Sequence, residues 1–445
     1  MEIVPETYLI AGSTASEIAA EVESAVSGGR LPPGASLPPV REAATQARVS
    51  PNTAAAAYRL LRERGIVETA GRRGTRVRAR PASTSREEIR VEVPPGVRDL
   101  AKGNPDPALL PPLHEALAAA ARAHAERPAM YGTDDDEELL DLAGARLRAD
   151  GIAPGPLAIT SGTLDAVERV LAAYLRPGDA IAVEDPGWTA LLDLVAALRL
   201  RPVPVRIDDD GPLPDELGRA LRTGVRAVVI TSRAQNPTGA AITAERARAL
   251  RAELAARPEV LFIEDDHGAG FVDVPAHPLA GVTESWIHTR STAKDLGPDL
   301  RLALITGDPV TLGRLRGRQR LASGWVSHLL QRAVAHLWRT EAVDRAEVGA
   351  AYRMRRDGLV AALAERGVPA HGRSGLNVWV PVADEASAIT GLLARGWAAA
   401  PGARNRVSTP PALRLTVSSL SPGEIPALAG DLAAALRPAP SGRYG

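Results

Sequence analysis

Residues 157–175 read LAITSGTLDAVERVLAAYL, a short apolar strand pattern followed at once by a helical pattern. The same alternation occurs in VRAVVIT (225–231) and TAERARALRAELAARP (243–258), and further strand patterns are VLFIEDD (260–266) and RLALITG (301–307). Strands that alternate with helices along a chain form a mostly parallel sheet with helices on both faces. The sequence therefore predicts a large α/β domain.

The chain on either side of this domain differs in pattern. After about residue 309 the helices lengthen, which predicts a smaller α+β unit at the C-terminal end. A polar stretch with three prolines and no helical period precedes the α/β domain and is typical of a linker. We predict an N-terminal domain over 1–80, a linker over 81–97, a large subdomain over 98–308, a small subdomain over 309–436 and a tail over 437–445.

The composition excludes several classes of protein. Of the 445 residues, 45% are hydrophobic and 24% are charged, which is the balance of a globular protein rather than a disordered one. The absence of cysteine excludes a disulfide framework, a thiolate metal site and a cysteine nucleophile. The N-terminal stretch lacks the pattern of a secretory signal, and no apolar run reaches about 18 residues. We expect a cytoplasmic protein without a membrane segment.

Charge is concentrated in the N-terminal part, although the whole chain has as many basic as acidic residues. Residues 30–80 contain 11 arginines and only three acidic residues. A basic region of this kind is the electrostatic signature of a nucleic-acid-binding module. The sequence therefore predicts that residues 1–80 bind double-stranded DNA.

The elements expected in this basic part follow the order of a winged helix-turn-helix. Helical patterns cover residues 16–27 and 40–47, and Ser50-Pro51 begins a third helix with a serine cap and proline at the first position. Two short alternating strands follow, on either side of residues 71–74. The third helix would lie in a major groove. The residues expected to contact DNA are Arg41, Ser50, Asn52, Thr53, Arg72 and Arg73.

The lysines are unusual, because Lys102 and Lys294 are the only two in the sequence. Arginine supplies the remaining basic charge. Arginine stays protonated in proteins, whereas a lysine amine can be made neutral and nucleophilic. A lysine that persists in such a chain is therefore a candidate for covalent chemistry.

Several polar residues stand where predicted strands end. They are Asn236 in the turn NPTG, Asp265, Lys294 and Arg301, while residues 161–163 begin a helix directly after a strand. Ligands of open α/β sheets collect at the carboxyl ends of the strands, and a helix N-terminus binds anions. A lysine for an aldehyde, a carboxylate for a ring nitrogen, an anion site for a phosphate and an aromatic ring for stacking, which Trp188 would supply, together match pyridoxal 5'-phosphate.

At this point the sequence resembles the fold type I aminotransferases, and with its basic N-terminal part it resembles the MocR subgroup of the GntR transcriptional regulators. The N-terminal similarity extends over residues 28–77, nearly position by position. The body carries, in the order of the family, KGNPDPALLP, MYG, ITSGTLDAVE, PGDAIAVEDPGW, NPTG, EDDHGAGF, STAKDLGPDLRLALITGDP and LRLTVSS. Each fragment is weak alone, but eight in order and with matching spacing are specific.

The resemblance implies a role for each matching residue. Lys294 would form the internal aldimine with pyridoxal phosphate, Asp265 would pair with the ring nitrogen, and Asn236 with His267 would bind the ring hydroxyl. Trp188 would stack on the ring, and Arg414 would bind the carboxylate of an amino-acid effector. The phosphate would be held by Ser161, Gly162, Thr163, Ser291 and Arg301, with Tyr131 reaching it from the second subunit of a homodimer.

Three departures from the family pattern concern the chemistry of this site. His267 stands where the family usually has tyrosine, Ala293 replaces a hydroxyl residue before the lysine, and an acidic turn at 133–136 replaces a proline and glycine turn. The resemblance predicts a regulator that senses the cofactor or an amine ligand through Lys294. Two alternatives remain: an active aminotransferase with a DNA-binding arm, and a DNA-binding protein whose body has lost the cofactor. A metal site at Asp265, Asp266 and His267 lacks further ligands, and we expect none.

Overall fold

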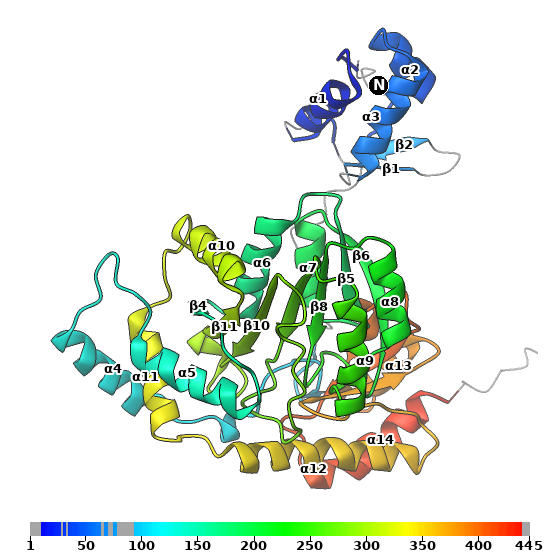
Figure 1. Cartoon of the computed structure of the whole chain (residues 1–445). Helices are drawn as coiled ribbons and strands as arrows, with labels where there is room; N and C mark the ends of the chain where they lie inside the picture. The colour runs from blue at the N-terminus through cyan, green and yellow to red at the C-terminus, as the bar shows by residue number, and fades with distance from the viewer. Residues whose placement is uncertain are drawn as a thin grey trace, which may run out of the picture. The chain divides into compact units, whose positions relative to one another are not determined.

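The structure is a computed structural model that describes residues 10–27, 30–32, 34–63, 66–69, 74–77 and 93–437 (Figure 1). The chain divides into two compact units, of which one consists mainly of Met1–Glu88 and the other contains most of the remaining chain. Arg72 and Arg73, most of the predicted linker and nearly all of the predicted tail lie outside the described residues. The domain boundaries given above stay predictions.

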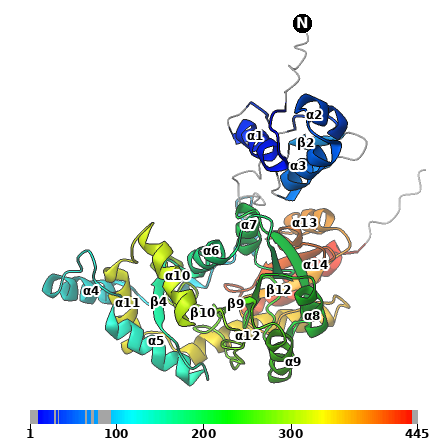
Figure 2. The same cartoon turned by 45° about the horizontal axis from the view of Figure 1, so that its top comes forward.

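The N-terminal unit has the helices and the strand pair that its sequence predicts (Figure 2). Its core is formed by buried residues of α1, α3 and the loops, among them Ile18, Tyr58 and Leu61. The hydroxyl Oγ of Ser50 accepts a hydrogen bond from the backbone N–H of Thr53 at 3.1 Å, which caps α3 as expected. The elements are α1 (Ala15–Ser27), α2 (Val40–Gln46), α3 (Pro51–Glu63) and the antiparallel strands β1 (Val67–Thr69) and β2 (Thr75–Val77).

The body contains the predicted α/β sheet, which has eight strands in the order β4-β11-β10-β9-β8-β5-β6-β7. Strands β5, β8, β9 and β10 run parallel to one another, while β11 is antiparallel to both β10 and β4. The strands are β4 (Leu157–Thr160), β5 (Ala180–Asp185), β6 (Arg201–Asp208), β7 (Gly211–Pro212), β8 (Ala227–Thr231), β9 (Leu261–Asp265), β10 (Trp286–Ser291) and β11 (Ala303–Gly307).

Helices cover this sheet, as the alternation of strands and helices requires. One core joins β5, β8 and β9 to α8 and α9, with Phe262 of β9 fully buried in it, and Figure 1 shows these two helices side by side along the sheet. The helices of this part are α4 (His114–Glu126), α5 (Glu137–Ala149), α6 (Thr163–Tyr174), α7 (Thr189–Ala197), α8 (Pro214–Arg222), α9 (Ala244–Ala255), α10 (Pro309–Arg320) and α11 (His328–Arg339), with 3-10 turns η3 (Pro107–Leu109) and η4 (Pro298–Leu300).

The C-terminal part is the smaller α+β unit that the sequence predicts. Its core packs Leu359 and Leu428 from two helices against Val378 and Leu413 from an antiparallel sheet ordered β12-β15-β14. A separate parallel pair joins β13 to β3, which is the first strand of the body. The elements are β3 (Arg98–Asp99), α12 (Arg345–Ala364), β12 (Asn377–Pro381), α13 (Glu385–Leu393), β13 (Trp397–Ala398), β14 (Ala400–Pro401), η5 (Gly402–Arg404), β15 (Ala412–Thr416), η6 (Pro422–Glu424) and α14 (Ile425–Ala435).

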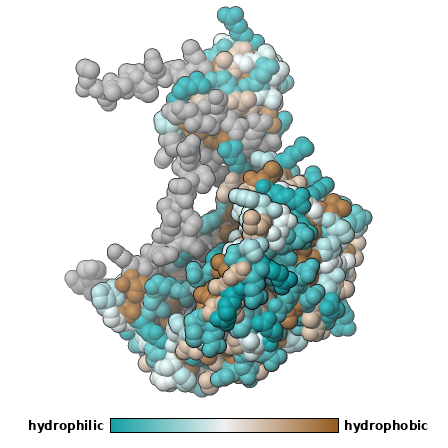
Figure 3. Space-filling model, turned by 90° about the vertical axis from the view of Figure 1, so that its left-hand side faces the viewer, coloured by the Kyte–Doolittle hydropathy of each residue, from teal (hydrophilic) through white to brown (hydrophobic). Residues whose placement is uncertain are grey.

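On the face that Figure 3 shows, the described surface is mostly hydrophilic with small hydrophobic patches. Large exposed hydrophobic side chains of the body include Met130, Tyr131, Leu321 and Trp325. Within the described ranges, no helix has both the length and the apolar character needed to cross a membrane.

Candidate cofactor site

The register between β9 and β10 determines which acidic side chains face the site. Glu264 lies opposite His288, and Asp265 lies opposite Thr289. Successive side chains of a strand point to opposite faces. Phe262 belongs to the core under α8 and α9, so Glu264 shares that face and Asp265 points to the other one.

Asp265 is held in place by two polar side chains. Its Oδ1 accepts a hydrogen bond from the Thr289 hydroxyl at 3.2 Å, and its Oδ2 lies 3.1 Å from Nδ1 of His267. Burial lowers the pKa of His267, but the carboxylate of Asp265 outweighs burial and leaves this pKa above its ordinary value, while the nearby amine of Lys294 opposes that rise. Asp265, His267 and Lys294 therefore form one electrostatic group.

Lys294 and Arg414 approach the same short segment of backbone. The Nζ of Lys294 donates to the carbonyl oxygen of Gly103, and the Nη2 of Arg414 donates to the carbonyl oxygen of Ala101 at 2.6 Å. Arg414 also donates through Nη1 to Oδ1 of Asn236 at 3.2 Å. The lysine, the arginine and the asparagine, which are far apart in the sequence, are thus brought together.

Buried polar side chains fix the turn that carries Asn236. The Nε2 of Gln235 donates to Glu184 at 3.1 Å and to the carbonyl of Pro186 at 2.9 Å, while its Oε1 accepts from the N–H and the hydroxyl of Thr238. Burial raises the pKa of Glu184 to about 7, against hydrogen bonds from Thr231 and Gln235 that lower it. The turn is therefore fastened on both sides of Asn236.

The N-terminus of α6 lies beside an arginine. Gly162 caps this helix with φ +100°, and a Cβ atom added there would lie 3.0 Å from Nη2 of Arg301. The same nitrogen lies 3.3 Å from the carbonyl oxygen of Ser161, and the hydroxyl of Thr163 lies 3.5 Å from that of Thr289. Free N–H groups at a helix N-terminus and a neighbouring guanidinium form an anion site, which the glycine keeps open.

Asp185 attaches a C-terminal loop to the strand end that precedes Trp188. Its fully buried carboxylate accepts five hydrogen bonds of 2.7–3.0 Å from backbone and side-chain groups of Val407, Ser408 and Thr409. Gly187 and Asn405 exchange backbone and side-chain hydrogen bonds next to it. Trp188 is half-buried directly before α7, and no ring contact between it and another site residue is recorded among the described residues.

Two other residues singled out from the sequence remain: Tyr131 stands apart from this group, whereas Ser291 lies close to Lys294 along the chain. Tyr131 is 92% exposed, and among the described residues its ring meets that of Trp325 edge-on, with ring centroids 5.6 Å apart. Ser291 ends β10, and its hydroxyl accepts a hydrogen bond from the N–H of Ala293 at 3.2 Å. Within one chain, Tyr131 therefore belongs to the surface.

Behind Asp265 lies a cluster of buried charges that includes Asp266. The Asp266 carboxylate lies 2.6 Å from Nη2 of Arg233 and 3.1 Å from Nη2 of Arg290, and both arginines also meet Asp150. Burial raises the pKa of Asp266, but these arginines outweigh it and hold this pKa below its ordinary value. The cluster ties β9 and β10 to the end of α5.

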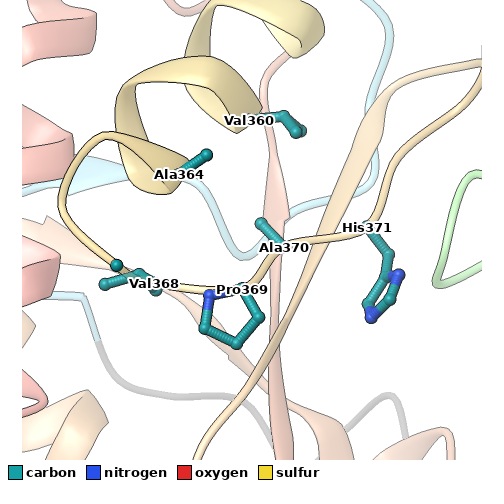
Figure 4. A pocket seen from close by; sticks show the side chains of 7 residues that line it. Val360, Ala364, Val368, Pro369, Ala370 and His371 are labelled. Carbon is teal, nitrogen blue, oxygen red and sulfur yellow. The ribbon is translucent and has the colours of Figure 1, made fainter.

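No group of three or more His, Asp or Glu side chains suited to a metal ion occurs among the described residues. A cavity of about 380 Å³ lies elsewhere, where α12 ends; Figure 4 shows Val360, Ala364 and Pro369 lining it, with His371 at its side. None of the residues discussed above lines this cavity.

Comparison with known proteins identifies the family of the chain. Residues 14–77 match the family "Bacterial regulatory proteins, gntR family", and residues 96–432 match "Aminotransferase class I and II". The chain is 39% identical over 434 residues, which is 96% of its own length and 100% of the other, to the vitamin B6 salvage pathway transcriptional repressor PtsJ of Salmonella typhimurium. The chain belongs to the MocR-type regulators of the GntR family.

Other relatives match the whole chain or its body alone. TauR of Rhodobacter capsulatus, an HTH-type transcriptional regulator, is 26% identical and covers 98% of this chain and 100% of its own. Among solved structures, the α-aminoadipate aminotransferase LysN of Thermus thermophilus has the fold of the body, with a TM-score of 0.68 and 23% identity over 80% of this chain and 95% of that one. This MocR-type regulator therefore joins a DNA-binding helix-turn-helix region to an aminotransferase-like domain.

Sequence reasoning missed several residues that support the site of this MocR-type regulator. Thr289 and Gly103 contact Asp265 and Lys294 directly. Thr289 stands in none of the quoted motifs, and the fragment KGNPDPALLP that contains Gly103 gives no sign of this contact. The sequence does indicate the cluster around Asp266. Acidic residues stand at 264 and 266, on either side of Asp265, and the basic residue types His288 and Arg290 stand on either side of Thr289. Acidic residues on one strand and basic residue types on its neighbour, at positions that point to the same side of the sheet, indicate a buried face to which both strands contribute.

Proposed function

We propose that this MocR-type regulator binds pyridoxal 5'-phosphate covalently through Lys294 and uses it to sense the cofactor itself or a small amine or amino acid. The observation that carries the proposal is the meeting of Lys294, Arg414 and Asn236 on one side of the sheet with Asp265 and His267. The vitamin B6 salvage repressor among the relatives supports a ligand of this class.

The side chains present fit the parts of that cofactor. When bound, the cofactor supplies an aldehyde for an amine and a ring that withdraws electrons. Lys294 provides the amine, Asp265 a carboxylate for the ring nitrogen, and Asn236 with His267 polar groups for the ring hydroxyl. Trp188 offers a ring surface. The phosphate would lie at the N-terminus of α6, against Ser161, Gly162, Thr163, Ser291 and Arg301.

We propose that Arg414 binds the carboxylate of an amino-acid effector. The residue is 8% exposed and its guanidinium now donates to Asn236 and Ala101, so a ligand carboxylate would replace neutral acceptors with a charged one. We further propose a homodimer in which Tyr131 of one copy reaches the phosphate of the other. The 92% exposure of Tyr131, beside exposed Met130, agrees with a surface that a second copy covers.

Replacing Arg414 by alanine is expected to leave the cofactor bound and to weaken ligands that carry a carboxylate. Loss of hydrogen bonds to a charged group costs about 1.5–3 kcal/mol, which is roughly a ten- to hundredfold rise in the dissociation constant. Titration of the visible spectrum with an amino acid and with the matching amine that lacks the carboxylate measures the effect. The exposed Arg395, which follows α13, supplies the control, and loss of cofactor in Arg414→Ala would contradict the assignment.

For DNA binding, we propose contacts from Arg41, Ser50, Asn52 and Thr53. Arg41, Ser50 and Asn52 are exposed, and Thr53 is half-buried in the first turn of α3. We propose that α3 enters the major groove and that Arg41 contacts a phosphate. Arg72 and Arg73, also proposed to contact DNA, lie outside the described residues.

Replacing Arg41 by alanine is expected to weaken DNA binding across sequences. One lost phosphate contact lowers the slope of log K against log salt by about one unit. Binding to an operator fragment and to unrelated DNA, each at several salt concentrations, measures this slope. Arg320→Ala removes the same charge from an exposed position of α10 and serves as the control. An unchanged slope in Arg41→Ala would count against the groove assignment.

The second candidate function is aminotransferase activity, which the placement of Arg414 beside Asn236 favours. One experiment separates this activity from sensing, and a second tests whether the body has lost the cofactor. Conversion of an amino acid and a 2-oxo acid at an ordinary enzymatic rate would support an enzyme with a DNA-binding arm. A purified protein that lacks visible absorption even after incubation with pyridoxal phosphate would support a regulator that has lost the cofactor.

A further inference from the structure

A small cavity lies next to the segment that carries Lys294, and charged side chains line it. Its volume is about 30 Å³, whereas about 10–15 Å³ by a comparable measure is enough for one water molecule. Its walls come from α5, β10, β11, α11, α12 and two loops. The charged lining residues are Arg146, Arg290, Asp295 and Arg345.

Hydrogen-bonding groups around the cavity are left without partners. Asp295 is 7% exposed, and its Oδ1 is buried and makes no hydrogen bond to any described residue. The Nε of Arg290 is likewise buried without a partner in the described chain. The guanidinium of Arg146 lies 4.6 Å from the ring centroid of Trp338, and no hydrogen bond from it to another described residue is recorded. Buried polar groups in native proteins normally have a partner.

Arginines outnumber carboxyl groups in the lining of the cavity. Arg290 and Arg233 share the carboxylates of Asp150 and Asp266, so these four charges compensate one another. Arg146 and Arg345 face the carboxyl group of Asp295, with Glu341 acting on Arg146 and Asp150 on Arg345 from outside the lining. The only hydrogen bond recorded from Arg345 to the described residues goes to the carbonyl oxygen of Ala269, which carries no charge.

We propose that this cavity binds one small monovalent anion of the size of chloride, held by Arg146, Arg345 and the carboxyl group of Asp295. The volume of about 30 Å³ suits a single small ion. The lack of a side chain at Gly270 leaves room for Asp295, because a Cβ atom added at residue 270 would lie 2.1 Å from Oδ2 of Asp295. Since Ser291 lines the cavity and Asp295 follows Lys294, an anion here would steady the segment that carries the lysine.

The protonation of Asp295 agrees with this site. Burial raises its pKa to about 7, although Arg345 and Arg146 lower it. Below that pH the carboxyl group is neutral, and its O–H can donate to an anion as the arginines do. The charged groups that line the cavity with Asp295 are Arg146 of α5, Arg290 of β10 and Arg345 of α12, so anion binding should weaken as the pH rises through about 7.

The test compares thermal unfolding of the full-length protein in sodium chloride and in sodium gluconate at equal ionic strength. A ligand that binds only the folded state raises the unfolding midpoint in a saturable way. We expect such a rise with chloride and bromide, and none with gluconate, whose anion is too large. Equal midpoints in chloride and gluconate would overturn the proposal.

Variants test whether the lining residues cause the rise of the unfolding midpoint in chloride. Arg345→Gln should abolish the rise of the unfolding midpoint in chloride relative to gluconate, even if it also lowers the midpoint in both salts. Arg320→Gln, at an exposed position, should retain that rise. Arg146→Gln serves in the same way if Arg345→Gln does not fold. Asp295→Asn keeps the size of the side chain and a donor, so its chloride response should persist in mildly alkaline buffer, where that of the unmodified protein declines.

Bromide identifies the position directly. In a crystal of the unmodified protein soaked in sodium bromide, anomalous scattering should give a peak in contact with Arg146 and Arg345. A cavity that holds only water, or a chloride response that survives Arg345→Gln unchanged, would place the binding elsewhere and refute the site. Neither measurement depends on the cofactor, so this proposal can fail while the proposed function stands.

Discussion

Replacement of Lys294 by alanine is expected to abolish the visible absorption of the cofactor-loaded protein. The sequence contains one other lysine, Lys102, whose side chain is 64% exposed and pairs with Asp99 at 2.9 Å. The amine of Lys294 lies instead against the Gly103 carbonyl and near His267. The expected change is therefore complete loss of the lysine-bound band, not a shift in its position.

Lys102→Ala is the matched control, because it removes the other side-chain amine and should leave the band intact. Reduction of the loaded protein with borohydride, followed by peptide mass analysis, should find the added mass of the cofactor on the peptide that contains Lys294. A band that persists in Lys294→Ala, or a modified peptide around Lys102, would refute the assignment. Transcription assays then show whether DNA binding depends on the attached cofactor.

Replacement of Arg233 by alanine is expected to destabilise the body by about 3–5 kcal/mol, the usual cost of removing one partner from a buried ion pair. Arg233 is 3% exposed and meets both Asp266, which is 1% exposed, and Asp150. Its removal leaves a buried carboxylate with less positive charge around it. Chemical unfolding at neutral pH, followed by circular dichroism, measures the change.

The control for this change is Arg339→Ala. Arg339 lies 2.6 Å from Glu138, but both side chains are about half exposed, so the loss should stay below about 1 kcal/mol. Similar losses from the two variants would show that the buried cluster contributes no more than a surface pair.

The pH dependence of the Arg233 variant has a definite sign. In the unmodified protein the pKa of Asp266 is lowered, because the arginines outweigh the effect of burial. Stability from such a group is present above the ordinary pKa of aspartate and is lost as the pH falls through the lowered value. The difference between the unmodified protein and Arg233→Ala should therefore shrink in acid, as measured by unfolding at several pH values.

Local patterns in the sequence were enough for much of the fold. The buried stripe of Ala54, Ala57, Tyr58 and Leu61 follows helical spacing, and the structure buries all four. The eight-stranded, mostly parallel sheet follows from the alternation of strands and helices. These features depend on residues close to one another in the chain, so periodicity reveals them.

The neighbours of the site residues could not be predicted in this way. Lys294 meets the carbonyl of Gly103, and Arg414 meets that of Ala101, across about 190 and 310 residues of chain. Such pairs depend on strand order and register, which periodicity leaves open. The roles predicted for the individual site residues came from motifs shared with a family, and they stay predictions until the spectra and variants above are measured.

The segment at residues 101–103 leads from β3, the first strand of the body along the chain from the DNA-binding region. Its carbonyl oxygens at 101 and 103 accept from the two side chains assigned to ligand binding, Arg414 and Lys294. A ligand that binds Arg414 or Lys294 would therefore compete with the backbone carbonyl group to which that side chain now donates. Under the proposed function, ligand binding would therefore change how the first residues of the body are held.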